Sequence, residues 1–413
     1  MRAIELADGV YWVGTNLQTE DLFEGIWPIP HGVSLNSYLV RGDKVAIIDL
    51  VREWTGTSGN MLQRIKSVLP NVGDIDYIVL NHLEPDHTGW LFTLRQLAPN
   101  AEIITSPKGV DLVRAFYGIE DNVRAVQTGD ELDLGQGKKF VFAEIPNVHW
   151  PETMATYEAS TQILFPCDAF GSFGGLKGVI FDDEVPAADQ EFWEEEMLRY
   201  YANIVATFSP NVLKAIDALG GIEIKMIAPS HGRIWRAHPE LVIKKYVRYA
   251  NYNQDFAEPE VCVAWGSMYG NTEIMLQAIL EGIASEGVVA HVHRLPNEDV
   301  SYVLSDAYKS AGLALGMPTY EYKMFPPLKY FLDLLELKHM YYKKVLPFGA
   351  FGWSGGAQKV FDGMTENMKW DVLDGVFFQG RPTDEDLAKG REQGAELARQ
   401  VKEIPPKAVG EEY

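Results

Sequence analysis

The amino-acid sequence predicts two domains in tandem, a sandwich of sheets covered by helices followed by a doubly wound parallel sheet. In the first 255 residues, short apolar runs alternate with polar turns, which is typical of strands, and helical spacing is interspersed. Residues 251–259 then lack apolar periodicity. Beyond them, apolar runs alternate regularly with helical stretches, as in a parallel sheet with helices on both faces. We therefore expect domains at residues 1–255 and 256–413.

The elements of the first domain follow from the period of the apolar residues. Runs of four to eight residues bounded by Gly, Asp or Asn predict strands, and apolar residues three to four apart predict helices. The clearest strands are expected at residues 10–14, 37–40, 45–50, 77–80, 102–105, 140–144 and 162–166. The helices are expected at residues 61–68, 90–97 and 191–208.

The second domain shows a stricter alternation. Strands are expected at residues 261–265, 288–295, 312–316, 345–351 and 375–379. Helices are expected at residues 272–286, 300–309, 327–337, 356–369 and 385–403. In a sheet of order 2-1-3-4-5, the loops after strands 1, 3 and 4 are neighbours at the carboxyl edge, where such folds bind ligands.

Composition excludes several classes of protein. The chain has 413 residues, 46% hydrophobic and 23% charged, with 36 Lys and Arg against 58 Asp and Glu, so the net charge is −22. This acidic balance disfavours binding to nucleic acid or to an anionic membrane. Cys167 and Cys262 are the only cysteines, which excludes a disulfide framework, a rubredoxin-type iron centre and a cysteine-bound iron–sulfur cluster. With no apolar run of about 18 residues and no signal peptide, we expect a soluble, cytoplasmic protein.

Acidic residues are concentrated between residues 182 and 196, where no base occurs. The acids are Asp182, Asp183, Glu184, Asp189, Glu191, Glu194, Glu195 and Glu196. We interpret them as a solvated loop followed by a helix start, where acids complement the helix dipole. A docking surface for a basic partner is the alternative.

A cluster of potential metal ligands follows the predicted strand at residues 77–80. The sequence N-H-L-E-P-D-H-T-G contains His82, Glu84, Asp86 and His87 within six residues. Alternate residues of an extended segment point the same way, so His82, Glu84 and Asp86 can converge, and His87 can join where the chain turns. Four ligands this close suit two adjacent metal ions.

Three further candidates, His149, Asp168 and His231, lie at other predicted strand ends. Each one alone would be interpreted as a turn residue or a cap, but together with the first cluster they favour a two-metal site. The other histidines lack this context and are expected to be structural. They are His31, His238, His291, His293 and His339.

This ligand set resembles that of the metallo-β-lactamase superfamily, whose fold is an αβ/βα sandwich with a metal pair at the strand ends. Hydrolases of that superfamily carry H-x-H-x-D-H, whereas Glu84 replaces the second His here, as in the flavodiiron proteins. Three carboxylates neutralise three of the four charges of a divalent pair, which suits iron better than zinc. The resemblance implies one iron on His82, Glu84 and His149. It implies a second iron on Asp86, His87 and His231, with Asp168 as the bridge.

A second constellation begins after the first strand of the second domain, in the loop G-S-M-Y-G-N-T-E. Its backbone N–H groups and the hydroxyls of Ser267 and Thr272 could hold a phosphate at the helix N-terminus. The loop matches neither a Walker motif nor G-x-G-x-x-G, so an ordinary loop is the alternative. The candidate residues in this loop are Ser267, Met268, Tyr269, Gly270, Asn271 and Thr272.

Two more loops strengthen this interpretation. Residues Pro318, Thr319 and Tyr320 follow the third strand, and Trp353, Ser354, Gly355 and Gly356 follow the fourth. The arrangement resembles flavodoxin, which implies FMN with its phosphate on the first loop and its ring against the other two. The aromatic side chains of Tyr269, Tyr320 and Trp353 either stack on the flavin or pack ordinarily.

The order of the two modules is that of the flavodiiron proteins. The resemblance implies an oxidoreductase that passes electrons through FMN to a non-haem diiron site, where dioxygen is reduced to water or nitric oxide to nitrous oxide. A dinuclear zinc hydrolase with a passenger flavodoxin-like domain is the alternative. An electron carrier without catalysis of its own is a weaker one, because the ligand set is complete.

The resemblance also implies partners. The electron donor would be a rubredoxin, a rubredoxin reductase or a reduced deazaflavin coenzyme, and two chains would form a head-to-tail homodimer, alone or within a dimer of dimers. A basic patch at Lys323, Lys329, Lys343 and Lys344 is a candidate docking site for an acidic donor. Trp150, Tyr200 and Tyr201 are candidates to line the diiron site, although core packing is the more economical interpretation for each.

Overall fold

The computed structural model describes residues 1–404 apart from 55, 177 and 255–256. These residues form two compact units. The first contains Met1–Tyr200 and Pro210–Val247, and the second contains Tyr201–Ser209 and the chain from Arg248 on. The expected boundary after residue 255 lies outside the described residues and stays a prediction.

The first unit is built on two sheets. The strands of the seven-stranded sheet, in spatial order, are β1 (Ile4–Ala7), β2 (Val10–Trp12), β7 (Tyr38–Arg41), β8 (Val45–Ile48), β9 (Tyr77–Val79), β10 (Glu102–Thr105) and β11 (Val123–Ala125). Those of the five-stranded sheet are β12 (Glu131–Gly135), β13 (Lys138–Glu144), β14 (Met154–Glu158), β15 (Ile163–Phe165) and β16 (Met226–Ile227). Two small sheets pair β3 (Thr15–Leu17) with β6 (Val33–Leu35), and β4 (Leu22–Phe23) with β5 (Trp27–Pro28).

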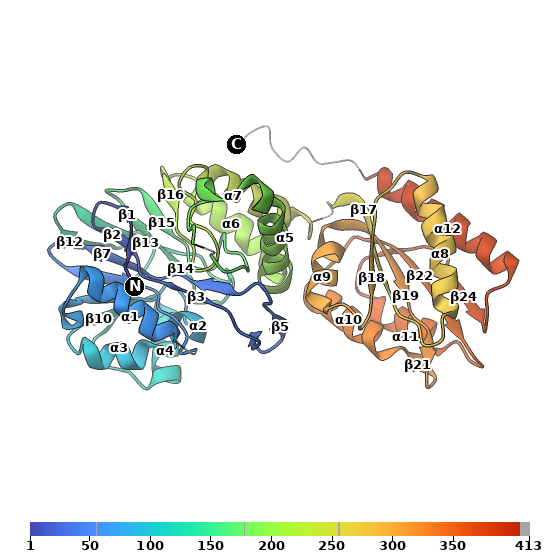
Figure 1. The fold of residues 1–413 in the computed structure, drawn as a ribbon, viewed down its shortest axis with the longest axis horizontal. Helices are drawn as coiled ribbons and strands as arrows, with labels where there is room; N and C mark the ends of the chain where they lie inside the picture. The colour runs from blue at the N-terminus through green and yellow to red at the C-terminus, as the bar shows by residue number, and fades with distance from the viewer. Residues whose placement is uncertain (55, 177, 255–256, 405–413) are drawn as a thin grey trace. The chain divides into compact units, whose positions relative to one another are not determined.

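The two large sheets enclose one hydrophobic core, with helices outside. Trp12 and Tyr38 from one sheet meet Phe140 and Phe165 from the other. The helices are α1 (Thr57–Val68), α2 (Pro85–Thr88), α3 (Leu91–Leu97), α4 (Pro107–Tyr117), α5 (Gln190–Tyr200), α6 (Ser209–Leu219) and α7 (Pro239–Asn251). Figure 1 shows α1, α3 and α4 on one side of the paired sheets and α6 and α7 on the other. The predicted sandwich covered by helices is therefore confirmed.

The second unit is a parallel sheet in the order β18-β17-β19-β22-β23, with β24 also paired to β22. Its strands are β17 (Glu258–Trp265), β18 (Ala290–Arg294), β19 (Ser310–Gly316), β22 (Lys344–Phe351), β23 (Asp371–Val372) and β24 (Val376–Gln379). A small hairpin joins β20 (Thr319–Tyr320) to β21 (Lys323–Met324). Since β23 and β24 together form the fifth strand, the predicted order 2-1-3-4-5 is confirmed.

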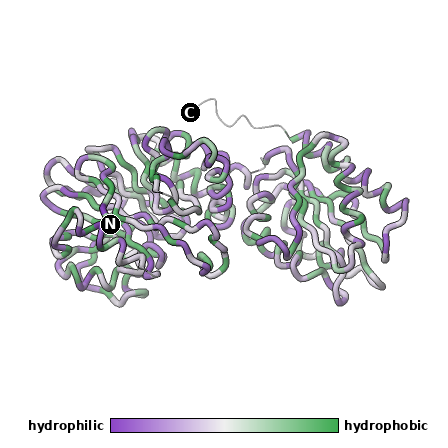
Figure 2. The backbone as a smooth tube through the Cα atoms, in the orientation of Figure 1, coloured by the Kyte–Doolittle hydropathy of each residue, from purple (hydrophilic) through white to green (hydrophobic). Residues whose placement is uncertain are grey.

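Helices cover both faces of this sheet. They are α8 (Asn271–Ser285), α9 (Val300–Lys309), α10 (Pro326–Leu337), α11 (Gly356–Thr365) and α12 (Asp384–Lys402). Figure 1 shows α8 and α12 on one face and α9 and α10 on the other. Figure 2 shows hydrophobic stretches along the central strands, and every residue of β19 is buried. Gly312 in β19 is required for this packing, because a Cβ there would lie 2.8 Å from the side chain of Val401 in α12.

The helix predicted at residues 191–208 is interrupted. Helix α5 ends at Tyr200, a π-helical segment spans Tyr201–Val205, and a 3₁₀ turn spans Ala206–Phe208. All five residues of the π-helical segment are buried, and the Asn203 amide donates a hydrogen bond to the Ser301 carbonyl at 3.0 Å. Contacts with distant residues thus accompany the change of helix type, which apolar spacing cannot reveal. Further 3₁₀ turns span Val72–Asp74, Asp182–Glu184 and Ala187–Asp189.

The acidic segment has a structural role. Buried Asp182 accepts hydrogen bonds from the backbone N–H groups of residues 236–238, just before α7. Arg236 pairs with Asp183 and Glu184, and Glu196 pairs with Arg199 in a buried ion pair. These contacts support the structural interpretation of the acidic run over the docking surface, although Asp182 and Glu196 are buried rather than solvated.

Candidate metal centre and flavin site

Seven side chains of the first unit converge on one buried site. In the first group, His82 Nε2 lies 3.2 Å from Glu84 Oε2, and His149 Nε2 lies 3.0 Å from the same oxygen. In the second group, His231 Nε2 lies 3.1 Å and His87 Nε2 lies 3.4 Å from Asp86 Oδ2. The structure thus brings together every residue that the sequence proposed as a metal ligand.

Asp168 lies between the two groups. Its Oδ2 is 3.4 Å from His82 Nε2 and 3.3 Å from His149 Nε2. Its Oδ1 is 3.0 Å from His87 Nε2 and 3.4 Å from His231 Nε2. One oxygen therefore faces each group, which is the geometry of a carboxylate that bridges two ions.

The spacing fits metal ions. Two ligand atoms about 2.1 Å from one ion and at right angles to each other are about 3 Å apart, close to the separations within each group. Among the described residues, Asp86 Oδ1 and Asp168 Oδ2 are buried and have no hydrogen-bond partner. Buried carboxylate oxygens without a donor are costly unless a cation satisfies them. The residues therefore fit a metal pair.

The ligand-rich segment is only partly extended. His82 and Glu84 follow β9 in an extended chain, as expected, but Pro85 begins α2, which carries Asp86 and His87. The expectation from an extended chain, that Asp86 points the same way as His82 and Glu84, therefore fails at Pro85. Asp86 lies with His87 and His231, which is the grouping that the resemblance implied. Pro is favoured at the first position of a helix, and the helical turn sends Asp86 to the second group instead.

Electrostatics favour cations at this site. Burial alone would lower the pKa of His82, but hydrogen bonds to Glu152 and Glu84 raise it to about 9. Burial likewise opposes a charge on His87, yet the carboxylates of Asp86 and Asp168 raise its pKa to about 10. The site is thus a buried, anionic pocket that stabilises positive charge.

Several residues that support the ligands were not predicted. Glu152 lies 2.8 Å from His82 Nδ1, and the Ser34 carbonyl oxygen lies 2.7 Å from His231 Nδ1. Both oxygens accept, so each Nδ1 carries the hydrogen and leaves Nε2 free for a metal. Asp49 holds Asn81, the residue before His82. The sequence could have pointed to Glu152 only because it is an acidic residue three positions after His149. No feature of the sequence indicated Ser34.

Of the three candidate lining residues, Trp150 and Tyr200 lie against the ligands. The Trp150 ring is 5.0 Å from that of His82, and the Tyr200 ring is 5.7 Å from that of His231. The Tyr200 hydroxyl is buried and makes no hydrogen bond to any described residue. Burial, then the charge of Asp168, raises its pKa well above 10. Tyr201 instead packs on Tyr308 and hydrogen-bonds Ser209.

The three predicted loops of the second unit lie side by side. The N–H of Gly266 donates to the Gly316 carbonyl at 2.9 Å, and the N–H of Met317 donates to the Phe348 carbonyl at 2.8 Å. The hydroxyl of Thr319 accepts from the N–H of Ala357, at the start of α11. The ends of β17, β19 and β22 thus form one edge, as the predicted order requires.

The first of these loops offers a phosphate cradle. Gly270 precedes α8 with a φ of 90°, a conformation that glycine adopts readily, and its N–H donates to the Ser267 hydroxyl at 2.9 Å. The buried Thr272 hydroxyl at the start of α8 has no hydrogen-bond partner among the described residues. A buried hydroxyl without a partner at a helix N-terminus fits a phosphate group.

Each of the three loops carries an exposed aromatic side chain. Tyr269 is 91% exposed and Trp353 is 74% exposed, and Tyr320 is also exposed. Tyr322, which was not predicted, meets Trp353 edge to face with ring centroids 5.8 Å apart. Exposure of this extent rules out ordinary core packing for Tyr269 and Trp353 and leaves both rings available to a flavin.

Of the four lysines proposed as a basic patch, Lys343 does not lie on the surface. Lys343 is buried, and its ammonium group donates to the carbonyl oxygens of Tyr308 and Ser310, both at 2.7 Å. Burial lowers its pKa to about 7. Lys329 and Lys344 are paired with Asp333 and Asp371. Of the four lysines, only Lys323 is exposed without an ion pair among the described residues.

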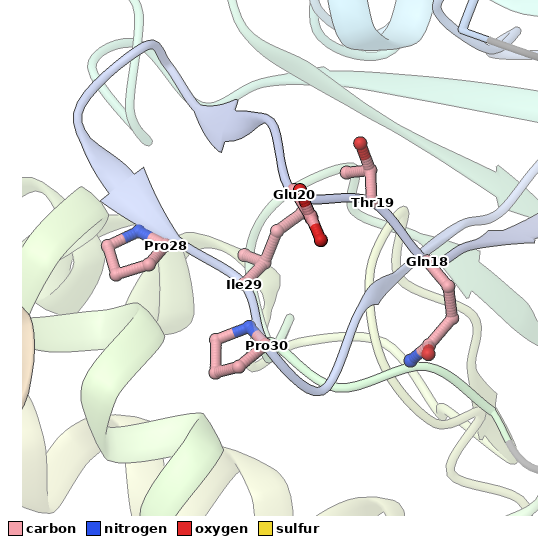
Figure 3. A pocket seen from close by; sticks show the side chains of 6 residues that line it. All are labelled: Gln18, Thr19, Glu20, Pro28, Ile29 and Pro30. Carbon is pink, nitrogen blue, oxygen red and sulfur yellow. The ribbon is translucent and has the colours of Figure 1, made fainter.

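The segment around the β4–β5 hairpin lines an open pocket of about 470 Å³. Figure 3 shows Gln18, Thr19 and Glu20 on one side of it and Pro28, Ile29 and Pro30 on the other. None of these side chains is a predicted ligand. The hairpin reaches the metal centre through Phe23, whose ring is 5.5 Å from that of His231.

The histidines expected to be structural lie outside both metal groups. His31 packs against Phe192, and His238 lies 3.4 Å from Glu240. His291 and His293 pair with acids of the second unit, and the ring of His339 stacks on Tyr341.

Comparison with known proteins follows the same division of the chain. Residues 33–232 match the family described as ODP family beta lactamase, and residues 263–398 match the flavodoxin family. The anaerobic nitric oxide reductase flavorubredoxin of Aeromonas hydrophila is 33% identical, covering 96% of this chain and 80% of that protein. The nitric oxide reductase of Moorella thermoacetica is 32% identical, covering 96% of this chain and 98% of that protein.

Solved structures agree. The rubredoxin oxygen:oxidoreductase of Desulfovibrio gigas superimposes with a TM-score of 0.91 at 29% identity, covering 97% of this chain and 99% of that one. The flavodiiron protein of Giardia intestinalis gives a TM-score of 0.91 at 29% identity, covering 97% of both chains.

Fold and site therefore define a metallo-β-lactamase-like domain joined to a flavodoxin-like domain. The chain belongs to the flavodiiron proteins. It is an oxidoreductase whose cofactors are FMN and a pair of non-haem irons. Within the described residues, no helix has both the length and the apolar character needed to cross a membrane.

Proposed function

We propose that this chain reduces nitric oxide to nitrous oxide, dioxygen to water, or both, with electrons that pass through FMN to the diiron centre. The observation that carries the proposal is Asp168, with one carboxylate oxygen toward each group of ligands. When bound, the irons would bind and reduce the gas, and FMN would supply them with electrons. Dioxygen takes four electrons and four protons to give two waters, and two molecules of nitric oxide take two of each to give nitrous oxide and water.

The ligands are proposed residue by residue. His82, Glu84 and His149 would hold one iron, and Asp86, His87 and His231 the other, with Asp168 between them. Glu84 supports iron over zinc, because a carboxylate replaces the imidazole that a hydrolase of this superfamily would carry. The hydrolase alternative is not favoured, since the relatives are reductases and the flavodoxin-like domain is complete.

Side chains around the ligands would control access and hydrogen bonding. The indole of Trp150 and the ring of Phe23 pack edge to face against His82 and His231, respectively. Both histidines are completely buried. The buried Tyr200 hydroxyl has no described partner, so it is free to donate a hydrogen bond to a substrate oxygen.

The flavin contacts are also proposed. The hydroxyls of Ser267 and Thr272 and the N–H groups of Met268, Tyr269 and Asn271 would hold the phosphate at the start of α8. Gly270 would shape the loop through its own hydrogen bond to Ser267. The loops Pro318–Thr319–Tyr320 and Trp353–Ser354–Gly355–Gly356 would flank the ring, and Trp353 is the most exposed aromatic of these two loops.

Partner, assembly and location complete the proposal. An external donor such as a rubredoxin, a rubredoxin reductase or a reduced deazaflavin coenzyme would reduce FMN. Two chains would pair head to tail, so that the FMN of one serves the irons of the other, in the cytoplasm. Sedimentation as an active monomer at working concentration would contradict the dimer.

The deciding experiment is stopped-flow oxidation of the fully reduced protein by each gas under matched conditions. Two irons and one FMN per chain, with rapid reoxidation by at least one gas, would support the proposal. Zinc without FMN, or reduced protein that neither gas reoxidises, would contradict it. The ratio of the two rates gives the preferred substrate.

A further inference from the structure

The two metal positions differ in the hydrogen-bond partners of their histidine Nδ1 atoms. At the first, His82 Nδ1 lies 2.8 Å from Glu152 Oε1, and both side chains are completely buried. At the second, His231 Nδ1 lies against the neutral carbonyl of Ser34, and His87 Nδ1 has no hydrogen-bond partner among the described residues. A histidine ligand is more basic toward a metal when its Nδ1–H is hydrogen-bonded to a carboxylate than when it is hydrogen-bonded to a carbonyl.

The ligands themselves do not account for such a difference. Each position has two histidines and one carboxylate of its own, and both share Asp168. Glu152 is therefore an additional carboxylate that hydrogen-bonds a histidine of the first group directly. The buried carboxylate of Asp49 also lies outside the ligand set, but it acts through its charge on both groups, at His87 and at His82.

Glu152 is held firmly in this place. Its Oε1 also accepts the N–H of Leu83 at 3.0 Å, and its backbone carbonyl accepts the hydroxyl of Ser106 at 2.6 Å. It lies three residues after His149, so it connects the loop that carries His149 to the segment that carries His82. Its Oε2 is buried without a hydrogen-bond partner among the described residues.

We propose that Glu152 is a positioning residue that makes the two irons unequal, by stabilising the ferric state at the position held by His82, Glu84 and His149. A buried negative charge close to one ion stabilises its higher charge state, because the low dielectric screens it poorly. The iron at this position is therefore the last to be reduced. The inference rests on the proposed diiron site and goes beyond it, since nothing in the ligand set distinguishes the two irons.

The test compares Glu152→Gln with a matched control. Glutamine keeps the size of the side chain and a carbonyl that can accept from His82 but removes the charge. Glu158→Gln is the control, because Glu158 is equally buried but bonds Ser160 and Thr161 rather than a ligand. Iron per chain is measured first. The two one-electron steps of the diiron centre are then titrated anaerobically, with the electron paramagnetic resonance signal of the half-reduced pair as the readout.

We expect Glu152→Gln to retain two irons and to raise the lower of the two reduction potentials. The signal of the half-reduced pair should then persist over a narrower range of applied potential. The ferric-to-ferrous ratio of that iron should fall at least tenfold at a given potential, a shift of about 59 mV for a one-electron step. Glu158→Gln should leave both steps unchanged. Potentials of Glu152→Gln equal to those of the unsubstituted protein, or an equal shift of both steps, would overturn the inference.

A second variant covers loss of iron. If Glu152→Gln does not hold two irons, Glu152→Asp is titrated instead. The shorter side chain keeps the negative charge but places it farther from His82. A smaller shift in the same direction supports the inference, and unchanged potentials overturn it. Absence of any half-reduced signal in the unsubstituted protein would instead contradict the diiron proposal itself, so the two failures are distinguishable.

Discussion

The carboxylate of Asp49 accepts two hydrogen bonds from Asn81, one from the backbone N–H at 2.8 Å and one from the side-chain amide at 3.2 Å. The same amide donates to the Phe165 carbonyl, and its oxygen accepts the Thr156 hydroxyl at 2.7 Å. Asn81 thus connects the end of β9 to the second sheet, and His82 is the next residue. Asp49 therefore helps to fix where the ligand segment begins.

Replacing Asp49 should loosen the metal centre. Asp49→Ala leaves the buried backbone N–H of Asn81 without its acceptor, which costs about 1–3 kcal/mol. It also removes one of the two acceptors of the Asn81 amide, which keeps the Phe165 carbonyl. We expect a lower melting temperature and faster loss of iron to a chelator. Asp43→Ala, at an exposed position of the same domain, is the control and should change neither. Normal iron retention in Asp49→Ala would show that Asn81 is held without it.

Removing one proposed ligand should affect one cofactor only. His87→Ala takes an imidazole from the second group and should lower iron content and gas reduction while FMN stays bound. Metal analysis and flavin absorbance measure the two separately. His238→Ala, an exposed histidine of the same unit, should alter neither. Loss of FMN together with iron would contradict the division into two independent modules.

A substitution in the flavin loop should weaken FMN binding and leave the iron content unchanged. Thr272→Ala removes the buried hydroxyl that has no described partner, and a hydrogen bond to a charged group is worth about 1.5–3 kcal/mol. FMN should therefore bind on the order of tenfold to a hundredfold more weakly, with iron unchanged. Fluorescence titration of the flavin-free protein measures the affinity. Ser285→Ala, at the far end of α8, should leave FMN affinity unchanged.

Tyr200 and its neighbour Tyr201 form a natural pair of variants. Tyr200→Phe removes the hydroxyl beside the ligands, and we expect kcat to fall on the order of tenfold, about 1.4 kcal/mol, with full iron content. Tyr201→Phe removes a hydroxyl that bonds Ser209 and should affect stability rather than turnover. Equal turnover in both variants would exclude a role for the Tyr200 hydroxyl in the reaction.

The stability of the second unit should depend on the protonation of His293. His293 Nδ1 lies 2.7 Å from Glu298 and its Nε2 lies 2.8 Å from Asp306, with His291 and Lys309 also near Asp306. Burial opposes a charge on His293, but these hydrogen bonds raise its pKa above 6.5, while the pKa of Asp306 falls to about 2. The folded state therefore holds the proton more tightly than the unfolded state does.

The sign follows from this difference. The stabilisation by His293 is complete below pH 6.5, the unfolded pKa, and is lost as the pH rises through the raised folded pKa. We expect His293→Gln to lower the temperature of flavin release at pH 5.5 and to differ little from the unsubstituted protein at pH 9. His339→Gln, on the surface of the same unit, is the control. A difference that grows with pH would contradict the assignment.

Much of the fold could be predicted because it depends on local pattern. The alternation after residue 259 predicted α9 to the residue and a parallel sheet with helical crossovers. The strand order 2-1-3-4-5 was expected from the doubly wound fold class rather than from local pattern. The break at Tyr201–Val205 could not be predicted, since residues distant in sequence, such as Ser301, contact this segment. Lys343 looked like a surface lysine because sequence alone does not reveal burial.

The sequence by itself determined which atoms are available to the metals, because His82, Glu84, Asp86 and His87 fall within six residues at the end of a strand. Their spacing alone did not decide how they divide between two metals. The resemblance to the flavodiiron proteins implied a division, and the same two groups lie together in the tertiary structure. The turn at Pro85 sent Asp86 to the second group, and packing placed one oxygen of Asp168 toward each group. Contacts over long sequence separations, such as Ser34 with His231 across 197 residues, cannot be inferred from local spacing, because they depend on how the two sheets pack together.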